Sequence, residues 1–310
     1  MTGSALPAAS PHLSETRRSR LIAIGLICCA VLFFALLDTS AKWLSGHMHP
    51  VQTVFARYAV SMVLVLMLLN PWSHPGVLRT KRPWLQGVRS LLLLGATALN
   101  FIALKYLQLA ETVSIMFAGP LLVALVAGPL LGEWPGPRRL AAIGVGFLGV
   151  LVITRPGVGG MHPAALLCVF GTICYSFYAL ATRQVAAYDP PETTMVYSGV
   201  AGTLAVLPII PFFWTMPQTP FVWLVMLAMG AFGGFGHWLL ILAHRLAPAT
   251  VLAPFIYSQI VWMIVLGWFV FGQFPDGWTF AGATIVIASG LYLLYRERVR
   301  KVPETAARLD

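Results

Sequence analysis

The sequence predicts an all-α integral membrane protein with ten transmembrane helices, arranged as two inverted five-helix repeats. Three observations predict this fold: the composition, the number of apolar runs that are long enough to span a bilayer, and a pattern of small residues and prolines that occurs twice. Of the 310 residues, 58% are hydrophobic and 10% are charged, and the mean hydropathy is +0.81. A soluble domain carries about 25% charged residues. The chain therefore has too few charges to cover a surface that faces water.

The first apolar run covers residues 21–44 and follows residues 1–20, which we expect to be a disordered cytoplasmic tail. This run is too long for a signal peptide, and no clear cleavage site follows it. Because backbone polar groups must be paired within each segment in lipid, every such run is expected to form a helix. Nine further runs are expected at residues 51–70, 84–104, 110–131, 138–154, 162–183, 192–213, 220–243, 249–271 and 277–295. Residues 296–310 remain as a basic cytoplasmic tail.

An internal repeat is clearest where residues 110–153 match residues 249–293. The offset between matched residues grows from 139 to 141, as single-residue insertions in a duplicated unit would produce. The matched pairs are Ala110 with Ala249, Gly128 with Gly267, Gly132 with Gly272, Pro135 with Pro275 and Gly149 with Gly290. The two repeats are predicted at residues 21–154 and 162–295. With five spans in each, the second repeat enters the membrane from the opposite side.

Lysine and arginine are distributed unequally between the two ends of these spans. With the N-terminus inside, fifteen of the 20 basic residues lie in the inner loops and tails, whereas only Lys42, Lys105 and Arg155 lie at the outer ends. Basic residues favour the cytoplasmic side, so both termini are predicted to be cytoplasmic. The net charge of +10 is attributed to this loop bias and not to nucleic-acid binding.

Several function classes lack their sequence signatures. An ATP-driven pump is disfavoured because the chain has no GxxxxGK[ST] loop, and a membrane-embedded enzyme would need a nucleophile with its base or a metal cluster such as HExxH. The four cysteines lie inside apolar spans without metal-ligand spacing. We expect no catalytic residue, no metal site and no cofactor.

The repeated linker resembles that of the EamA family in the drug/metabolite transporter superfamily. The resemblance rests on Gly132-Glu133-Trp134-Pro135 with Gly144 and Gly149, on Gly272-Gln273-Phe274-Pro275 with Gly282 and Gly290, and on the passage from Ala103 to Pro120. It covers about residues 21–296 and departs from the family pattern at Gln273, where an acid is usual. The chain is also similar to the YddG-type amino-acid exporters of that family. The resemblance implies that spans one to four and six to nine line a central cavity, and that spans five and ten lie outside it, where they would support a homodimer; a monomer remains the alternative.

Ionisable residues inside spans are costly and are therefore candidates for function. Asp38 and Arg57 lie at similar depths near the outer ends of the first two spans. They are expected to face each other, either as an ion pair that fixes the outer half of the bundle or as a gate that contacts a charged substrate. Arg89 lies near the inner surface, where its side chain is expected to extend to the lipid headgroups.

Polar and aromatic residues recur at helical spacing on several spans, and these faces are expected to point inward, since a tyrosine hydroxyl in lipid would lack a partner. The candidate substrate-binding residues are Asn100, Ser114, Tyr175, Tyr178, Tyr197, His237, Tyr257 and Gln259. The alternative for each is helix packing with interfacial aromatics. The interior prolines, which can kink helices, are Pro120, Pro129, Pro208 and Pro254.

These features favour a secondary transporter that works by alternating access around a central cavity. A sugar phosphate would need several basic cavity residues, whereas only Arg57 and Arg89 lie within spans. We therefore expect export of small metabolites across a bacterial inner membrane, above all of amino acids, including aromatic ones, with broad specificity. The alternatives are a transporter of a drug, nucleotide precursor or sugar phosphate, and a membrane-embedded enzyme. The expected partners are the small-molecule substrate and membrane lipids, without nucleic acid.

Overall fold

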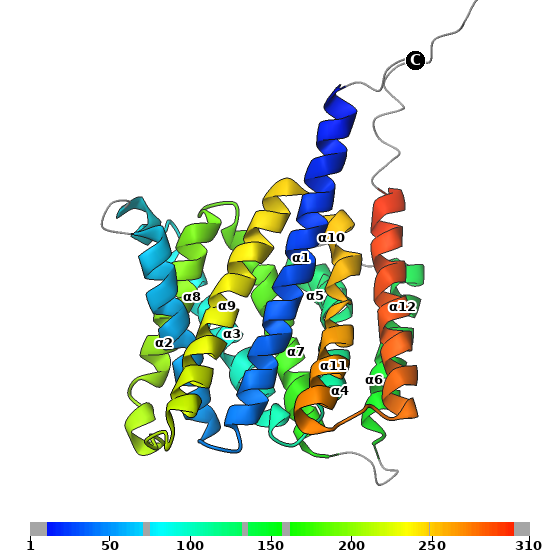
Figure 1. The fold of residues 1–310 in the computed structure, drawn as a ribbon. Helices are drawn as coiled ribbons and strands as arrows, with labels where there is room; N and C mark the ends of the chain where they lie inside the picture. Colours follow the sequence, from blue (N-terminus) through cyan, green and yellow to red (C-terminus); the bar gives the residue numbers. More distant parts are fainter. Residues whose placement is uncertain (1–10, 71–74, 132–135, 157–161, 248, 301–310) are drawn as a thin grey trace, which may run out of the picture.

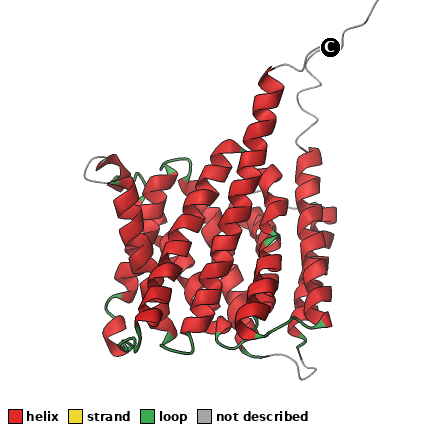
Figure 2. Cartoon of the chain, viewed as in Figure 1, coloured by secondary structure: helices red, strands yellow, loops and turns green. Residues whose placement is uncertain are grey.

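The computed structural model describes residues 11–70, 75–131, 136–156, 162–247 and 249–300, and over these residues it contains helices and no strand (Figures 1 and 2). The long elements of the first half are α1 (Pro11–Leu44), α2 (Pro50–Leu69), α3 (Pro83–Leu104), α4 (Leu109–Met116), α5 (Gly119–Leu131) and α6 (Pro137–Thr154). Those of the second half are α7 (Ala164–Val185), α8 (Pro191–Val206), α9 (Pro220–Leu246), α10 (Ala249–Ile256), α11 (Gln259–Phe271) and α12 (Gly277–Arg300). Two short 3₁₀ helices, η1 (Pro75–Leu78) and η2 (Ile210–Phe212), lie in the loops after α2 and α8.

These elements form ten membrane crossings, two of which are interrupted: α4 with α5, and α10 with α11. Nine crossings in the described part of the chain are long and apolar enough to span a bilayer. The tenth is α8, whose 16 residues are fewer than the roughly 20 that a spanning helix needs. The expected span at residues 192–213 is too long because Pro208, which lacks an N–H, follows the last turn of α8 and ends the helix instead of kinking it.

The first helix begins earlier, and the last helix ends later, than the sequence predicted. α1 begins at Pro11 instead of residue 21, and α12 continues to Arg300 instead of residue 295, so part of each expected tail is helical. Proline suits the first turn of a helix, and the polar residues that follow Pro11 include no helix breaker. Residues 1–10 and 301–310 lie outside the described residues. The free ends of α1 and α12 lie at the same end of the bundle, as an even number of crossings requires (Figure 1).

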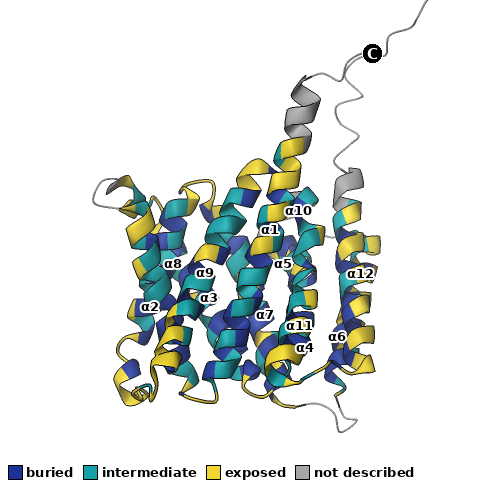
Figure 3. Cartoon of the chain, viewed as in Figure 1, coloured by how far each residue is buried: buried dark blue, intermediate teal, exposed yellow. Residues whose placement is uncertain are grey.

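The two halves of the chain pack against each other in matched pairs. α1 packs extensively on α9, and the equivalent helices of the other copy, α7 and α3, pack on each other in the same way. α6 packs along α12, its own equivalent. Contacts that recur with the halves exchanged are the arrangement that an inverted repeat produces. Buried residues accordingly lie between the helices, and exposed, largely apolar residues lie on their outer faces, which would contact lipid (Figure 3).

Glycines of the repeated motif have backbone roles. Gly272 caps α11 with a φ of 64°, a left-handed conformation that glycine adopts without strain. Gly149 and Gly282 bring α6 and α12 into backbone contact, since a Cβ on Gly282 would lie 2.6 Å from the carbonyl oxygen of Gly149. The first linker, Gly132 to Pro135, lies outside the described residues.

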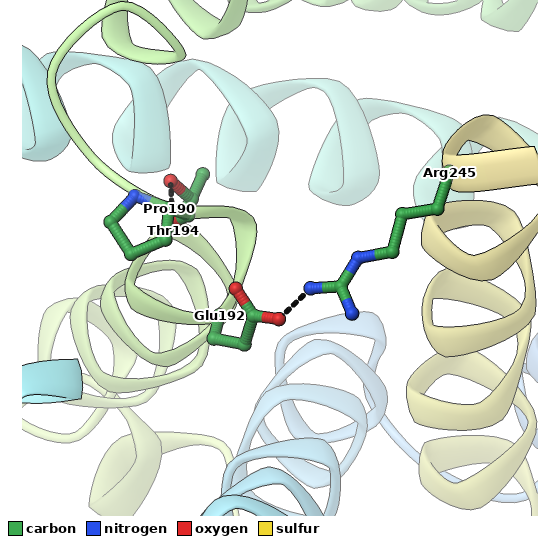
Figure 4. A network of polar contacts seen from close by, with 4 residues as sticks. All are labelled: Pro190, Glu192, Thr194 and Arg245. Atoms are coloured by element: carbon green, nitrogen blue, oxygen red, sulfur yellow. Dashed lines mark hydrogen bonds and ion pairs between the residues drawn. The ribbon is translucent and has the colours of Figure 1, made fainter. Parts of the chain in front are cut away.

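Loop contacts hold the repeats together at both ends. At one end, the Asp189 carboxylate accepts hydrogen bonds from the Thr80 hydroxyl, the Lys81 amide (3.0 Å) and the Gln86 side chain (2.8 Å). Near this end, Arg245 of α9 forms an ion pair with Glu192 in the first turn of α8 (Figure 4). These two side chains are partly exposed, so their pairing contributes little stability.

A matching contact joins the repeats at the opposite end. The Gln52 side chain donates to the carbonyl of Thr215 at 2.8 Å and accepts from the backbone amide and hydroxyl of Thr215, each at 3.0 Å. Gln52 is fully buried, so all three bonds are protected from water. The loop before α9 is thus fixed to α2, as the loop before α3 is fixed to Asp189.

We expect Asp189→Asn to destabilise the protein at neutral pH but not at low pH. Burial raises the pKa of Asp189, but the hydrogen bonds from Thr80, Lys81 and Gln86 outweigh it and lower the pKa below the ordinary value of 3.8. A carboxylate with a lowered folded-state pKa stabilises the fold above its unfolded pKa, and this stabilisation is lost as the pH falls through the folded value. The loss at pH 7 should be about 1–3 kcal/mol. Thermal unfolding in detergent between pH 3 and 8 measures it, and an equal difference at both extremes would contradict the assignment.

Candidate functional site

The fourth and ninth crossings are interrupted near their middles. α4 ends at Met116 and α5 begins at Gly119, because Pro120 has no N–H to donate to the Met116 carbonyl. In the ninth crossing, the Ser258 amide donates to the carbonyl of Phe255, three residues back, at 3.1 Å, and the Ser258 hydroxyl donates to the same oxygen at 2.6 Å. Pro129 and Pro254 lie inside α5 and α10, as expected.

The two interruptions face each other. Phe117 directly follows α4 and Tyr257 directly follows α10, and their rings meet edge to face with centroids 4.8 Å apart. Discontinuous helices near the bilayer midplane form the substrate sites of several transporter folds. The crossing of the two broken helices is therefore the place to look for a site.

A cavity of about 300 Å³ adjoins this aromatic pair. Its wall contains residues of every long helix except α6 and α8, among the residues described. Most of the lining side chains are apolar or aromatic, including Phe34, Phe101 and Phe117. The volume is in the range of small-molecule sites.

The helices that line the cavity differ in two ways from what the family resemblance implied. The seventh crossing, α8, contributes no lining residue among those described, because it packs behind α2 and α3. The tenth crossing, α12, was expected outside but contributes Leu294.

The structure brings eight of the ten predicted site residues to this cavity: Asp38, Arg57, Asn100, Tyr175, Tyr178, His237, Tyr257 and Gln259. Ser114 and Tyr197 lie elsewhere. Ser114 is fully buried on another face of α4, where its hydroxyl donates to the Ala110 carbonyl at 2.6 Å. Tyr197 is on α8, and its hydroxyl donates to the carbonyl of Leu78 in η1 at 3.1 Å.

The expected ion pair between Asp38 and Arg57 is absent from the described contacts, although both residues line the same cavity. Asp38 instead accepts a hydrogen bond from the Asn100 amide nitrogen at 3.2 Å. The Arg57 guanidinium lies over the ring of Tyr58, 4.6 Å from its centroid.

Three buried polar atoms at this cavity lack a hydrogen-bond partner in the described part of the chain: Nε of Arg57, Oδ1 of Asn100 and the hydroxyl of Tyr257. Arg57 is only 8% exposed and forms no other hydrogen bond there. Leaving a buried polar group unpaired costs about 1–3 kcal/mol, and more if it is charged. Three such groups around one cavity indicate a site for a polar ligand.

Arg89 does not extend to the headgroups, so that expectation is wrong. It is 3% exposed, and its guanidinium donates to the hydroxyls of Thr182 (2.7 Å) and Ser198 (2.8 Å), to the carbonyl of Thr194 (3.3 Å) and to the hydroxyl of Tyr178 (3.2 Å). The position of Arg89 along its own helix could not predict these partners, because they lie on two other helices, α7 and α8.

Comparison of the sequence with models of known protein families tests the family resemblance that the linker motifs indicated. The model of the EamA-like transporter family matches residues 21–155 and residues 162–296. The chain belongs to the EamA-like transporter family. The family resemblance seen in the sequence is thus confirmed, and the protein is a multi-pass membrane transporter of small metabolites.

Known EamA-type relatives extend over nearly the whole chain. An S-adenosylmethionine uptake transporter of Rickettsia conorii is 24% identical over 290 residues, which are 92% of this chain and 97% of the relative. A riboflavin transporter of Vibrio cholerae is 27% identical over 267 residues, 85% of this chain and 90% of the relative. A solved crystal structure with 20% identity has a TM-score of 0.61 and covers 91% of this chain and 99% of that one, which shows the shared fold.

Sequence reasoning missed the apolar wall of this EamA cavity. Phe34 lies one turn before Asp38 on α1, and Phe101 follows Asn100 on α3. Apolar residues occur on every face of a membrane helix, so these gave no signal of their own.

Proposed function

We propose that this EamA protein is a secondary transporter of zwitterionic metabolites, with amino acids, including aromatic ones, as its simplest substrates, and that it exports them across a bacterial inner membrane. The proposal rests on two buried side chains in the wall of an otherwise largely apolar and aromatic cavity. One is an acid, Asp38, and the other is a base without a hydrogen-bond partner among the described residues, Arg57.

The three parts of an amino acid match three parts of the wall. Arg57 would bind the carboxylate, and Asp38, oriented by Asn100, would bind the ammonium. The rings of Tyr175 and Tyr178, whose centroids are 5.6 Å apart, would pack on the side chain.

Alternating access requires contacts that break when the cavity opens to the other side. Lys42 provides such a contact at the end opposite the termini: its ammonium donates to the carbonyls of Leu104 (3.1 Å) and Leu107, and it lies 5.4 Å from the ring centroid of Phe271. These contacts join α1 to the end of α3, to the loop before α4 and to α11. We propose that they close the outer side of the cavity and release when the solute leaves there.

A second candidate substrate class is supported by the aromatic wall and by the names of the relatives. S-adenosylmethionine combines an amino-acid head with a planar base, whereas riboflavin has a planar ring system without a zwitterion. A transporter of planar heterocycles would use the same rings but would not need Asp38 and Arg57. The two classes therefore differ in how strongly transport depends on this pair.

Counterflow into proteoliposomes tests the proposal. The purified full-length protein is reconstituted in liposomes loaded with unlabelled phenylalanine, and uptake of labelled phenylalanine, leucine, S-adenosylmethionine and riboflavin is compared with protein-free liposomes. We expect phenylalanine and leucine to exchange. Movement of riboflavin without either amino acid would contradict the proposal and favour the second class.

A further inference from the structure

A second, smaller cavity of about 60 Å³ adjoins the transport cavity. The two share four lining residues, Arg57, Leu93, Tyr178 and His237, so they have a common wall. Arg89 and Ser198 line only the smaller one. Because one water needs about 10–15 Å³ by this kind of measure, the smaller cavity has room for a carboxylate-sized group.

The charges around the smaller cavity are unbalanced. Two guanidinium groups, those of Arg57 and Arg89, line it, and none of its lining residues is acidic. An arginine stays protonated in proteins, so both groups remain cationic. The bonds of Arg89 go to neutral oxygens, which orient the group but do not neutralise it. Asp38 lies on the wall of the larger cavity and does not line the smaller one.

We propose that the smaller cavity is an anion subsite that takes the carboxylate of the transported solute between Arg57 and Arg89. Buried charges in proteins are normally paired, and a second cation in reach makes an anion the favoured occupant. Arg89, held in place by α7 and α8, then determines the specificity for solutes that carry a carboxylate. The transport proposal alone does not require this role. The inference rests on the proposed function, since it assigns a place to one group of the same solute.

Binding to the purified full-length protein in detergent tests the subsite without transport. The probes are phenylalanine, 3-phenylpropionate, which lacks the ammonium, and 2-phenylethylamine, which lacks the carboxylate; their affinities follow from the rise in unfolding temperature on titration. We expect Arg89→Gln to weaken binding of the two carboxylates about tenfold or more and to leave the amine unchanged. Arg20→Gln, which removes an exposed arginine of α1, should change none of the three.

Two results would overturn the subsite. If Arg89→Gln weakens carboxylates and amine equally, Arg89 only holds the helices together. The second result concerns chloride. If removing chloride weakens binding of the amine to the unmodified protein, and Arg89→Gln abolishes this effect of chloride without weakening the carboxylates more than the amine, the occupant of the smaller cavity is an inorganic anion. Should Arg89→Gln not fold, Ser198→Ala, which frees one N–H of Arg89, is expected to give a smaller loss confined to the carboxylates, and an equal loss for all probes would contradict us.

The subsite and the transport proposal fail in different ways. Carboxylate-selective binding without amino-acid counterflow would overturn the proposed function and leave the subsite in place. Counterflow of phenylalanine with no carboxylate selectivity at Arg89 would overturn the subsite and leave the proposed function in place.

Discussion

Replacing Arg57 with methionine is expected to impair transport severely while leaving the folded protein as stable as before, or more stable. Arg57 is buried without a hydrogen-bond partner in the described part of the chain, so its charge costs stability in the absence of a solute. A buried charge without a hydrogen-bond partner is costly, and Asp38 keeps its hydrogen bond from Asn100 in this variant, so we expect no loss of stability. Loss of the carboxylate partner should lower the transport rate about 100-fold. Counterflow and thermal unfolding measure the two effects.

Arg89→Met is the matched comparison for this prediction. It also removes a buried guanidinium, but it breaks four hydrogen bonds to α7 and α8 and leaves their oxygens without this donor. We therefore expect Arg89→Met to lower the unfolding temperature, in contrast to Arg57→Met. If Arg57→Met destabilises the solute-free protein as much as Arg89→Met does, Arg57 is a structural residue and not a ligand of the solute.

The largest loss of stability from a single added methyl group is expected at Gly282. The new Cβ would lie 2.6 Å from the carbonyl oxygen of Gly149 and 2.5 Å from the side chain of Ile153, so α12 must move away from α6. Because one of these contacts is backbone, no rotamer change relieves it, and we expect Gly282→Ala to cost about 3 kcal/mol. Thermal unfolding in detergent measures the loss.

Gly144→Ala is the control for the glycine prediction. Gly144 lies within α6, and a Cβ there meets nothing within 4 Å. Alanine favours a helix interior over glycine by roughly 0.5–1 kcal/mol, so this change should be neutral or stabilising. Equal losses at Gly144 and Gly282 would show that helix propensity, and not the close approach of α6 and α12, governs these positions.

The fold could be predicted from two features of the sequence, namely the length of the apolar runs and the internal repeat. Pro120 marked the break in the fourth crossing. The break in the ninth crossing did not follow from the sequence, because it depends on which carbonyl the Ser258 amide reaches, and no proline stands at that residue. The start of α1 was placed too late because the composition that marks the edge of lipid does not mark the end of a helix.

The candidate site was predicted in part, for a related reason. Helical spacing placed Tyr175 and Tyr178 on an inward face, and these two residues do line the cavity. Spacing cannot say whether a helix reaches the cavity, so Tyr197 on α8 was included although α8 packs behind α2 and α3. Nor can depth in a span reveal partners on other helices, as the buried position of Arg89 illustrates.

Protection of a cysteine in the cavity wall tests the central claim most directly, namely that the solute occupies the cavity between the broken helices. Ala253, on the wall in α10, is replaced with cysteine in a protein whose four native cysteines are changed to alanine. Ala283→Cys, at a buried position of α12 outside the wall, is the control. We predict that a water-soluble maleimide labels the protein at residue 253 and not at residue 283, and that a transported amino acid slows the labelling. Labelling that no transported solute slows would contradict the account.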